Sequence, residues 1–335
     1  MHIYCNCNHI EIVKYYVYII TPTIAVCKHK NDFCRIFYKG NDMRKKAPPF
    51  TGVCTALATP FKSGEIDYDA LKELIEYQIS EGVDALLVCG TTGEASALTA
   101  KERKELVFKV AVQISGRVPL VVGVGTNVTA TTVAWSLHAA SCGADALLTV
   151  TPYYNKGTEE GIVSHFLEVA DRVALPQIVY HVPSRTGVRL SMTQLEKIFA
   201  HPNVVAIKEA DPDMDRFTDE IAKFGGEISF YTGNDSLVIP SMAVGGIGVI
   251  SVISNLLPAE MSEIVRLHRS GSVKESRARF MRLLPLMRVL FERTNPAPLK
   301  YALSLCGFGT GELRLPLAPG PPELKEKIAK IMALL

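Results

Sequence analysis

The chain has 335 residues and a formal net charge of +2; 48% of its residues are hydrophobic and 21% are charged. This composition supports a large buried core, and α/β barrels of this length occur as one domain. The sequence has no long basic run and no apolar stretch of about 20 residues, which argues against a nucleic-acid partner and against a transmembrane helix.

Residues 1–46 show no periodicity that ends in a recognisable helix or strand cap. Their apolar run, "VKYYVYIITPTIAVC", resembles a signal sequence only weakly, because Pro22 interrupts it and a small-residue cleavage site is missing. Six potential metal ligands in this segment do not have the spacing of a common zinc site: Cys5, Cys7, His9, Cys27, His29 and Cys34. We interpret residues 1–46 as a disordered or non-native extension and expect Met43 to be the true start.

From residue 50 onward, short apolar runs rich in β-branched residues alternate with longer amphipathic segments. Eight runs are predicted to be strands: 53–60, 84–90, 119–125, 146–152, 177–183, 204–210, 228–234 and 248–254. The segments between them have the pattern of helices, and the first of these opens with an Asp cap and ends near Gly82.

The predicted strands are apolar without strict alternation, which indicates a parallel sheet buried on both faces. Eight strand–helix units in series favour a closed (β/α)8 TIM barrel over an open doubly wound sheet. An open sheet would carry a glycine fingerprint after its first strand, where this chain has "TPFKSGE". We predict a catalytic barrel over residues 47–271 and a helical C-terminal subdomain over residues 272–335, packed on the barrel or on a partner subunit.

In such a barrel the active site lies at the carboxyl ends of the strands. The second predicted strand ends in "CGTTGEAS", where a tight glycine turn would leave Thr91 and Thr92 near the mouth. Their hydroxyl and N–H groups suit carboxylate binding and proton relay, although an ordinary turn capped by threonines is the alternative. The fourth strand ends in "TPYYN", and adjacent loop tyrosines are more often packing residues than catalytic ones.

The fifth predicted strand ends in "YHVPSRTG", which contains Tyr180, His181 and Arg185. A tyrosine hydroxyl at the barrel mouth can relay a proton. An arginine there can bind a carboxylate through two hydrogen bonds. The alternatives are a surface salt bridge for Arg185 and a satisfied core histidine for His181.

The sixth predicted strand, "VVAIKEA", carries Lys208 near its end. Regular alternation places Val204 and Ala206 on the barrel-interior face with Lys208, and Glu209 on the opposite face. Burial among apolar side chains favours the neutral amine, which is the nucleophile that forms a Schiff base with a carbonyl. The alternative is a buried ion pair with Glu209 or Glu94. The tyrosines and the arginine on neighbouring strand ends favour the catalytic interpretation.

The last two strands end in the glycine-rich turns "TGND" and "GGIGVISV". Such turns can hold phosphate in barrels, so a phosphosugar enzyme is an alternative. Neither turn contains a basic residue, and we therefore rank this alternative lower.

Five motifs occur in order along residues 50–335: "GTTGE", "TPYYN", "YHVPSRTG", "IKEA" and "NPAPLKYAL". Together they resemble the dihydrodipicolinate synthase family of pyruvate-dependent class I aldolases, whereas residues 1–46 have no counterpart. The resemblance implies condensation of pyruvate with L-aspartate 4-semialdehyde, the first committed step of diaminopimelate and lysine biosynthesis. It implies no metal or organic cofactor, and a cytoplasmic homotetramer built as a dimer of dimers.

The resemblance also implies roles for individual residues. Lys208 would form the Schiff base with pyruvate, and Tyr180 would act beside it as general acid and base. Thr91 would connect Tyr180 in a proton relay to Tyr154, which would reach across from the neighbouring subunit. The expected substrate-binding residues are Thr92 and Ile250 at the pyruvyl group, Gly233 close to them, and Arg185 at the carboxylate of the semialdehyde.

Relatives on the same scaffold, N-acetylneuraminate lyase and 2-keto-3-deoxy sugar acid aldolases, would share the lysine and the tyrosine. "PSRTG" separates them, because Arg185 suits a second substrate with a short acidic tail, and "GTTGE" in place of a serine-containing version points the same way.

The chain departs from the family pattern in two places. His181 stands where the family often has Asn, a substitution the family accepts. At the allosteric lysine site, Asn127 and Tyr153 match the pattern. Four positions differ from the Ser, His, His and Glu of sensitive enzymes: Ala95, Ala100, Arg103 and Thr131. Without that Glu the ammonium of lysine lacks its counter-charge, so we expect weak or absent feedback inhibition.

Overall fold

The computed structural model describes residues 47–335, which belong to a single compact unit. The predictions made for residues 1–46, including the start at Met43 and the cysteine and histidine spacing, lie outside the described residues. None of the described helices is long and apolar enough to cross a bilayer.

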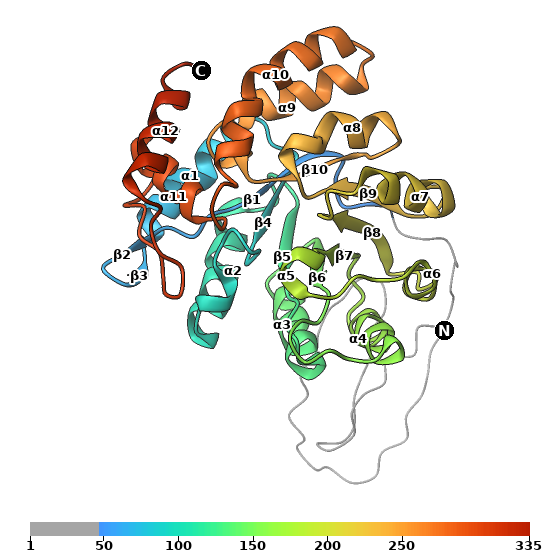
Figure 1. Cartoon of the computed structure of the whole chain (residues 1–335). Helices are drawn as coiled ribbons and strands as arrows, with labels where there is room; N and C mark the ends of the chain where they lie inside the picture. Colours follow the sequence, from blue (N-terminus) through green and yellow to red (C-terminus); the bar gives the residue numbers. More distant parts are fainter. Residues whose placement is uncertain (1–46) are drawn as a thin grey trace, which may run out of the picture. The chain divides into compact units, whose positions relative to one another are not determined.

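Eight parallel strands close into a barrel in the order β1-β10-β9-β8-β7-β6-β5-β4, which confirms the predicted (β/α)8 architecture (Figure 1). They are β1 (Gly52–Ala56), β4 (Ala85–Val88), β5 (Leu120–Gly123), β6 (Ala146–Val150), β7 (Gln177–His181), β8 (Val204–Glu209), β9 (Ser229–Thr232) and β10 (Gly248–Ser251). Apart from the first residue of β1, every strand lies within a run predicted from the sequence. These strands are almost entirely buried because helices cover their outer faces.

The helices that surround the barrel follow the strands along the chain. They are α1 (Tyr68–Ser80), α2 (Ala100–Ile114), α3 (Thr129–Ser141), α4 (Glu159–Arg172), α6 (Met192–Phe199), α7 (Met214–Phe224), α8 (Val238–Ala243) and α9 (Pro258–Arg269). The predicted Asp cap is confirmed, since Asp67 accepts a hydrogen bond from the N–H of Ala70. The sequence analysis missed a short antiparallel hairpin, β2 (Phe61–Lys62) and β3 (Glu65–Ile66), between β1 and α1.

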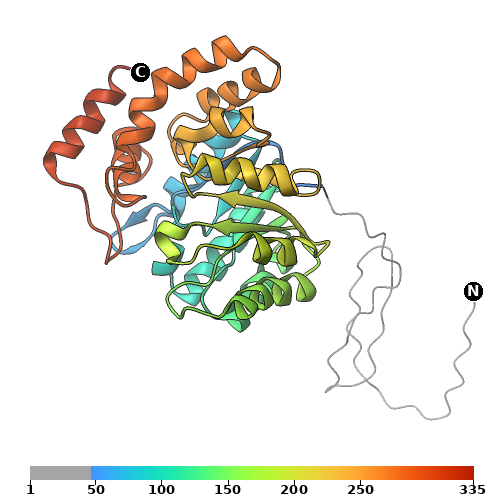
Figure 2. The same ribbon diagram turned by 45° about the vertical axis from the view of Figure 1, so that its right-hand side comes forward.

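Three further helices form the predicted C-terminal extension: α10 (Val273–Val289), α11 (Ala297–Leu305) and α12 (Pro322–Met332). Figures 1 and 2 show them, in orange to red, gathered on one flank of the barrel. They pack on the barrel of their own chain, because Lys300 of α11 forms a buried ion pair with Glu94 after β4. The division of this unit near residue 272 stays a prediction.

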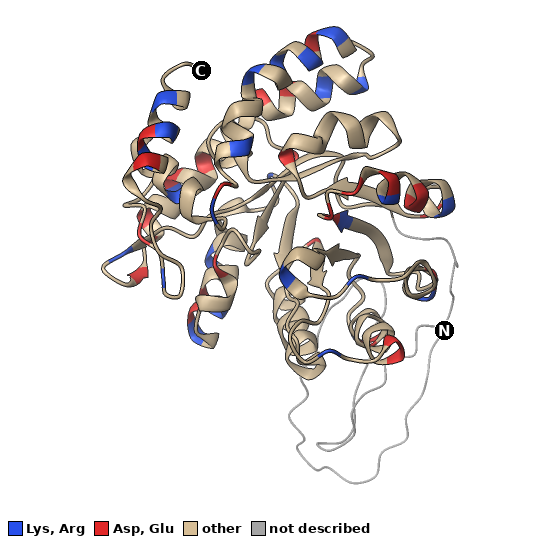
Figure 3. Ribbon diagram, viewed as in Figure 1, with Lys and Arg blue, Asp and Glu red and all other residues tan. Residues whose placement is uncertain are grey.

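Charged residues concentrate on the helices and loops, as Figure 3 shows. Among the residues of the eight barrel strands described above, the only Lys, Arg, Asp or Glu are Lys208 and Glu209 at the end of β8. A charged pair in an otherwise uncharged barrel is costly unless each member has a specific partner or task. This pair therefore marks the end of β8 as the place to look for chemistry.

The pairing of β7 with β8 contains a register shift. Gln177 pairs with Val204, but the next residue, Ile178, pairs with Ala206. The prediction that Val204 faces the barrel interior was wrong for this reason: the extra residue of the bulge turns Val204 toward the outer helices. Past the bulge the alternation is regular, and Lys208 faces inward as predicted.

Two aromatic rings fill the barrel interior at its amino end. Tyr231 of β9 stacks on Phe50, with ring centroids 4.3 Å apart, and its hydroxyl donates a hydrogen bond to the Phe50 carbonyl at 2.6 Å. Between them and the strand ends lie small and apolar side chains, including Cys54, Ala85 and Leu148. The interior is thus packed below the level of Lys208, as expected for this fold.

Candidate active site

A cavity of about 690 Å³ lies at the carboxyl ends of the barrel strands. Six of the eight predicted site residues line it: Thr91, Thr92, Tyr180, Arg185, Lys208 and Gly233. They come from the turns after β4 and β9, from β7 and β8, and from the short helix α5 (Pro183–Thr186). Residues that are far apart in sequence therefore meet because parallel strands end at the same face of the barrel.

Lys208 is 6% exposed and faces Tyr180 on the adjacent strand. Its Nζ lies 4.4 Å from the centroid of the Tyr180 ring. Both carboxylates considered as its ion-pair partners are engaged elsewhere. Glu94 Oε1 lies 2.6 Å from Lys300 Nζ, and Glu209 Oε2 lies 2.7 Å from His181 Nδ1. The ion-pair interpretation with Glu209 or Glu94 was therefore wrong, and the amine is directed into the cavity.

Gly233 leaves room for the lysine side chain. A Cβ placed on Gly233 would lie 2.8 Å from Lys208 Cε and 2.8 Å from the Ala210 Cβ, closer than such atoms approach in proteins. The glycine immediately after β9 therefore allows the close approach of its backbone to the lysine stem.

Two buried acidic groups lie near the lysine charge. Asp235 accepts hydrogen bonds from the N–H groups of Val252 and Ile253 at 3.0 and 2.9 Å. Burial raises the pKa of Asp235, and the positive charge of Lys208 is among the influences that oppose this rise. Burial likewise raises the pKa of the Cys54 thiol, so Cys54 is a neutral core side chain and not a second nucleophile.

The turn that carries Thr91 and Thr92 is held in a sparsely populated conformation. Cys89 and Glu94 both adopt positive φ, at 56° and 50°. Glu94 is anchored at both oxygens: Oε1 pairs with Lys300 Nζ at 2.6 Å, and Oε2 accepts from the N–H of Arg314 at 3.1 Å. A strained turn persists only where surrounding contacts enforce it, and here the C-terminal extension supplies them.

Asn295 is a site residue that the sequence analysis missed. It lies between α10 and α11 and lines the cavity. Its Nδ2 donates to Thr92 Oγ1 at 3.0 Å, and its carbonyl accepts from Arg185 Nη2 at 3.1 Å. The motif "NPAPLKYAL" was the available signal, but nothing in it shows which residues its asparagine would contact.

Two predicted site residues do not line the cavity of the single chain. Ile250 of β10 is fully buried in the barrel interior, where it pairs in register with Cys54. Tyr154 is 88% exposed and adopts a φ of 71°. The participation of Tyr154 in a neighbouring subunit's site stays a prediction.

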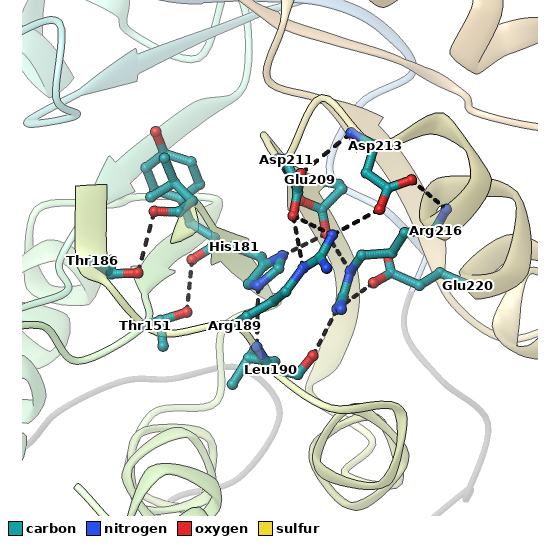
Figure 4. Close-up of polar contacts among 12 residues, drawn as sticks. Thr151, His181, Thr186, Arg189, Leu190, Glu209, Asp211, Asp213, Arg216 and Glu220 are labelled. Atoms are coloured by element: carbon teal, nitrogen blue, oxygen red, sulfur yellow. Dashed lines mark hydrogen bonds and ion pairs between the residues drawn. The ribbon is translucent and has the colours of Figure 1, made fainter. Parts of the chain in front are cut away.

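Behind the cavity, on the helix side of β7 and β8, lies a buried polar cluster (Figure 4). His181 Nε2 accepts a hydrogen bond from the N–H of Leu190 at 3.1 Å, so the proton of the neutral ring is on Nδ1, which donates to Glu209 Oε2 at 2.7 Å. Burial, assisted by the charge of Arg216, lowers the pKa of His181 to about 4. His181 is thus a satisfied core histidine, as the sequence analysis considered.

The same cluster contains Glu220 and Arg216 of α7. Arg216 Nη2 lies 2.6 Å from Glu220 Oε1 and donates to the Leu190 carbonyl at 2.8 Å. Burial raises the pKa of Glu209 to about 7, and burial together with the nearby Glu209 raises that of Glu220 to about 8. His181, Glu209 and Glu220 bring potential ligand atoms within 4.8 Å of one another. Both nitrogens of the histidine ring already form hydrogen bonds, and a positively charged guanidinium lies beside the carboxylates. These contacts indicate a network that shares protons instead of a metal centre.

This barrel buries one lysine at the carboxyl end of its sixth strand, unpaired with Glu209 or Glu94 and facing a tyrosine. Such an arrangement defines the class of barrel enzymes that form a Schiff base with a carbonyl substrate. A profile of the Dihydrodipicolinate synthetase family matches residues 49–334. The chain belongs to this family.

Individual relatives agree with this assignment. The chain is 42% identical over 286 residues to the 4-hydroxy-tetrahydrodipicolinate synthase of Citrifermentans bemidjiense, a match that covers 85% of this chain and 98% of the relative. The crystal structure of dihydrodipicolinate synthase from Thermotoga maritima superposes with a TM-score of 0.83 at 41% identity, over 86% of this chain and 100% of that one. A structure described as a monomeric dihydrodipicolinate synthase variant also has a TM-score of 0.83, at 40% identity, over 85% and 96% of the two chains.

Proposed function

We propose that the protein condenses pyruvate with L-aspartate 4-semialdehyde through a Schiff base on Lys208, as a 4-hydroxy-tetrahydrodipicolinate synthase. The observation that carries the proposal is the buried amine of Lys208, which has neither Glu209 nor Glu94 as a partner and faces Tyr180 in the cavity. Relatives that are 42% and 44% identical over 85% and 81% of this chain carry this name.

The first step follows from these two groups. The neutral amine of Lys208 attacks the C2 carbonyl of pyruvate, and Tyr180 protonates the carbonyl oxygen, which leaves as water once the C=N bond forms. Removal of a C3 proton then gives an enamine. Its C3 attacks the aldehyde carbon of the second substrate, and the aldehyde oxygen takes up a proton and becomes a hydroxyl group. The amino group of that substrate displaces Lys208 and closes the ring, which returns the free lysine with one water released in all.

Thr92, Gly233 and Ile250 are the proposed neighbours of the bound pyruvyl group. Thr92 lies at the cavity wall with its hydroxyl held by Asn295, which supports a carboxylate-binding role. Gly233 leaves the space that the lysine stem occupies, and Ile250 forms part of the apolar barrel interior. No metal or organic cofactor is part of this scheme.

Thr91 and Tyr154 complete the proposed proton relay. Thr91 lines the same cavity as Tyr180, whereas Tyr154 is exposed on the loop after β6 and would enter the site of a neighbouring subunit. We therefore propose that subunits associate around a shared site and, from the family to which the chain belongs, that the assembly is a cytoplasmic homotetramer. Mixing Tyr154→Phe chains with Lys208→Ala chains tests this arrangement, because mixed oligomers should regain activity that neither variant has alone. Full activity of a monomer would contradict it.

Arg185 is proposed to bind the carboxylate of the semialdehyde. Its guanidinium lies at the cavity wall, where Nη2 donates to the Asn295 carbonyl. Assays with aspartate semialdehyde, 2-keto-3-deoxy sugar acids and N-acetylneuraminate separate the candidate substrates. We expect turnover of the semialdehyde, and Arg185→Ala should raise its KM while pyruvate still forms the imine. Preferential cleavage of a sugar acid would establish the alternative aldolase or lyase instead.

We also propose weak or absent inhibition by lysine. Thr131 offers no carboxylate for the inhibitor's ammonium, and the guanidinium of Arg103 is buried, with Nη2 donating to the Gly123 carbonyl at 2.6 Å. A lysine titration of the enzyme should leave activity nearly unchanged. Half-loss of activity at sub-millimolar lysine would contradict the proposal.

A further inference from the structure

The residues that follow Tyr180 and Lys208 in the chain are themselves in contact. Because successive side chains of a strand point to opposite faces, His181 and Glu209 face the outer helices while Tyr180 and Lys208 face the cavity. His181 and Glu209 are register partners, both fully buried, and their side chains join β7 to β8 at 2.7 Å. The polar contact therefore lies one residue beyond the reacting pair, on the opposite side of the sheet.

Each member of this pair is fixed by a second hydrogen bond. The N–H of Leu190 donates to His181 Nε2, and the N–H of Asp211 donates to Glu209 Oε1 at 2.6 Å. The first bond sets the ring tautomer and orientation, and the second fixes the carboxylate to the turn after β8 (Figure 4). The pair is consequently anchored to both strands and to the backbone that follows each of them.

The pairing of β7 with β8 is irregular at the start of both strands, so a contact that fixes their register has a structural role. The bulge between Gln177 and Ile178 interrupts the regular ladder at the start of β7 and β8. A bulge leaves one residue unpaired, and a slip by one residue would turn Lys208 toward the helices. A side-chain bond at the far end of the two strands opposes this slip where the reacting groups lie.

The surrounding charges stabilise the contact. Arg216 reaches both acidic groups, with Nη2 2.6 Å from Glu220 Oε1 and Nε 3.9 Å from Glu209 Oε2. Arg189, at the exposed edge of the cluster, pairs with Asp211 and Asp213 at 2.8 Å. Arg216 of α7 thus places a positive charge beside the buried pair, and Arg189 holds the turn after β8.

We propose that His181 and Glu209 are positioning residues for the Schiff-base chemistry: their hydrogen bond holds Lys208 and Tyr180 in the geometry that imine formation requires. The proposal rests on the proposed function, because it names residues that support the same site. It assigns the pair a role in the rate of the first chemical step in addition to its contribution to folding.

The test is the rate at which pyruvate forms a borohydride-trapped adduct, measured by timed quenching and intact mass, with melting temperatures determined in parallel. His181→Leu removes the cross-strand bond, whereas His181→Asn keeps an amide N–H that can donate to Glu209. Ile198→Ala is the matched control, since Ile198 is fully buried on α6 in the outer core beside β8 but contributes no polar group.

We expect His181→Leu to slow adduct formation about 100-fold, the effect of a misplacement of about 1 Å, and His181→Asn to recover most of the rate. Ile198→Ala should lose stability and keep the rate. Should His181→Leu not fold, Glu209→Gln replaces it, because His181 and Asp211 each donate to a different oxygen of Glu209 and a glutamine has an NH2 group in place of one of them. Adduct formation by the folded variants at the wild-type rate would overturn the positioning role alone. A wild-type protein that forms no adduct would instead overturn the proposed function.

Discussion

Tyr180 and Lys208 are register partners on β7 and β8, and the amine of Lys208 lies 4.4 Å from the centroid of the Tyr180 ring. A carbonyl carbon bonded to this amine would lie beside the tyrosine, within the cavity at the strand ends. The two groups can then act on the same carbonyl: Lys208 attacks its carbon as the nucleophile, and Tyr180 donates a proton to its oxygen.

Removal of the Tyr180 hydroxyl tests its role as proton donor. We predict that Tyr180→Phe lowers kcat by about 10²- to 10⁴-fold, the usual contribution of a general acid, with little change in melting temperature. Tyr231→Phe is the control, because it loses a structural hydrogen bond to Phe50 and about 1 kcal/mol of stability but should keep its activity. Steady-state kinetics of the two variants decide the matter, and wild-type kcat in Tyr180→Phe would exclude the assigned role.

A methyl group on Gly233 tests the packing of the lysine stem. Gly233→Ala should displace the Lys208 side chain and slow imine formation, because the new Cβ would lie 2.8 Å from Lys208 Cε. Gly226→Ala is a suitable control, since a Cβ there has no atom within 4 Å. Pre-steady-state trapping with pyruvate compares the variants. Equal rates in both would show that the lysine does not depend on this space.

The buried cluster behind the site should make stability depend on pH. Glu220 has its pKa raised from 4.5 to about 8 in the folded protein, so the folded state binds more protons than the unfolded state between these values. The resulting contribution to stability is fully present below about pH 4.5 and is lost as the pH rises through about 8.

The glutamine in Glu220→Gln cannot ionise, so the stability of this variant should fall less than that of the wild type as the pH rises. The variant should therefore be the more stable protein at about pH 9. Urea unfolding across the pH range measures the difference, with Glu73→Gln, on the exposed face of α1, as a control. Parallel pH profiles for wild type and Glu220→Gln would show that folding does not raise the pKa of Glu220.

The ion pair of Lys300 with Glu94 should be important for stability. Lys300→Met leaves the Glu94 carboxylate buried without its cation, and such a loss costs about 3–5 kcal/mol. The double variant Lys300→Met/Glu94→Gln should regain part of this stability, because the unpaired charge is then absent. Denaturant unfolding measures both, and a single variant as stable as the wild type would contradict the assignment.

The barrel could be predicted because its strands are buried on both faces and therefore form eight uninterrupted apolar runs. Lys208 could be found for the same reason, as one of the three charged residues in the predicted runs, the others being Asp84 and Glu209. The bulge, which leaves Val205 without a register partner, could not be predicted, since period-two alternation assumes a regular ladder. The hairpin of β2 and β3 was missed because two-residue strands carry too little pattern.

The contacts of the site were harder to predict than its members. Nothing in the sequence shows that Asn295 reaches both Thr92 and Arg185, because these contacts depend on how the C-terminal helices pack. The His181 partner of Glu209 was likewise not predicted, and a pair of Glu209 with Lys208 was kept only as an alternative. Strand alternation puts Glu209 and Lys208 on opposite faces, and the register of β7 then makes His181 the available partner.

The central claim is that pyruvate becomes covalently bound to Lys208. Borohydride reduction in the presence of pyruvate, followed by peptide mass spectrometry, tests it directly. We predict a single adduct on the peptide that contains Lys208 and its loss in Lys208→Ala, whereas Lys223→Met, which removes an exposed lysine of α7, still forms the adduct. An adduct that persists in folded Lys208→Ala, or a wild-type protein that forms none, would contradict the account.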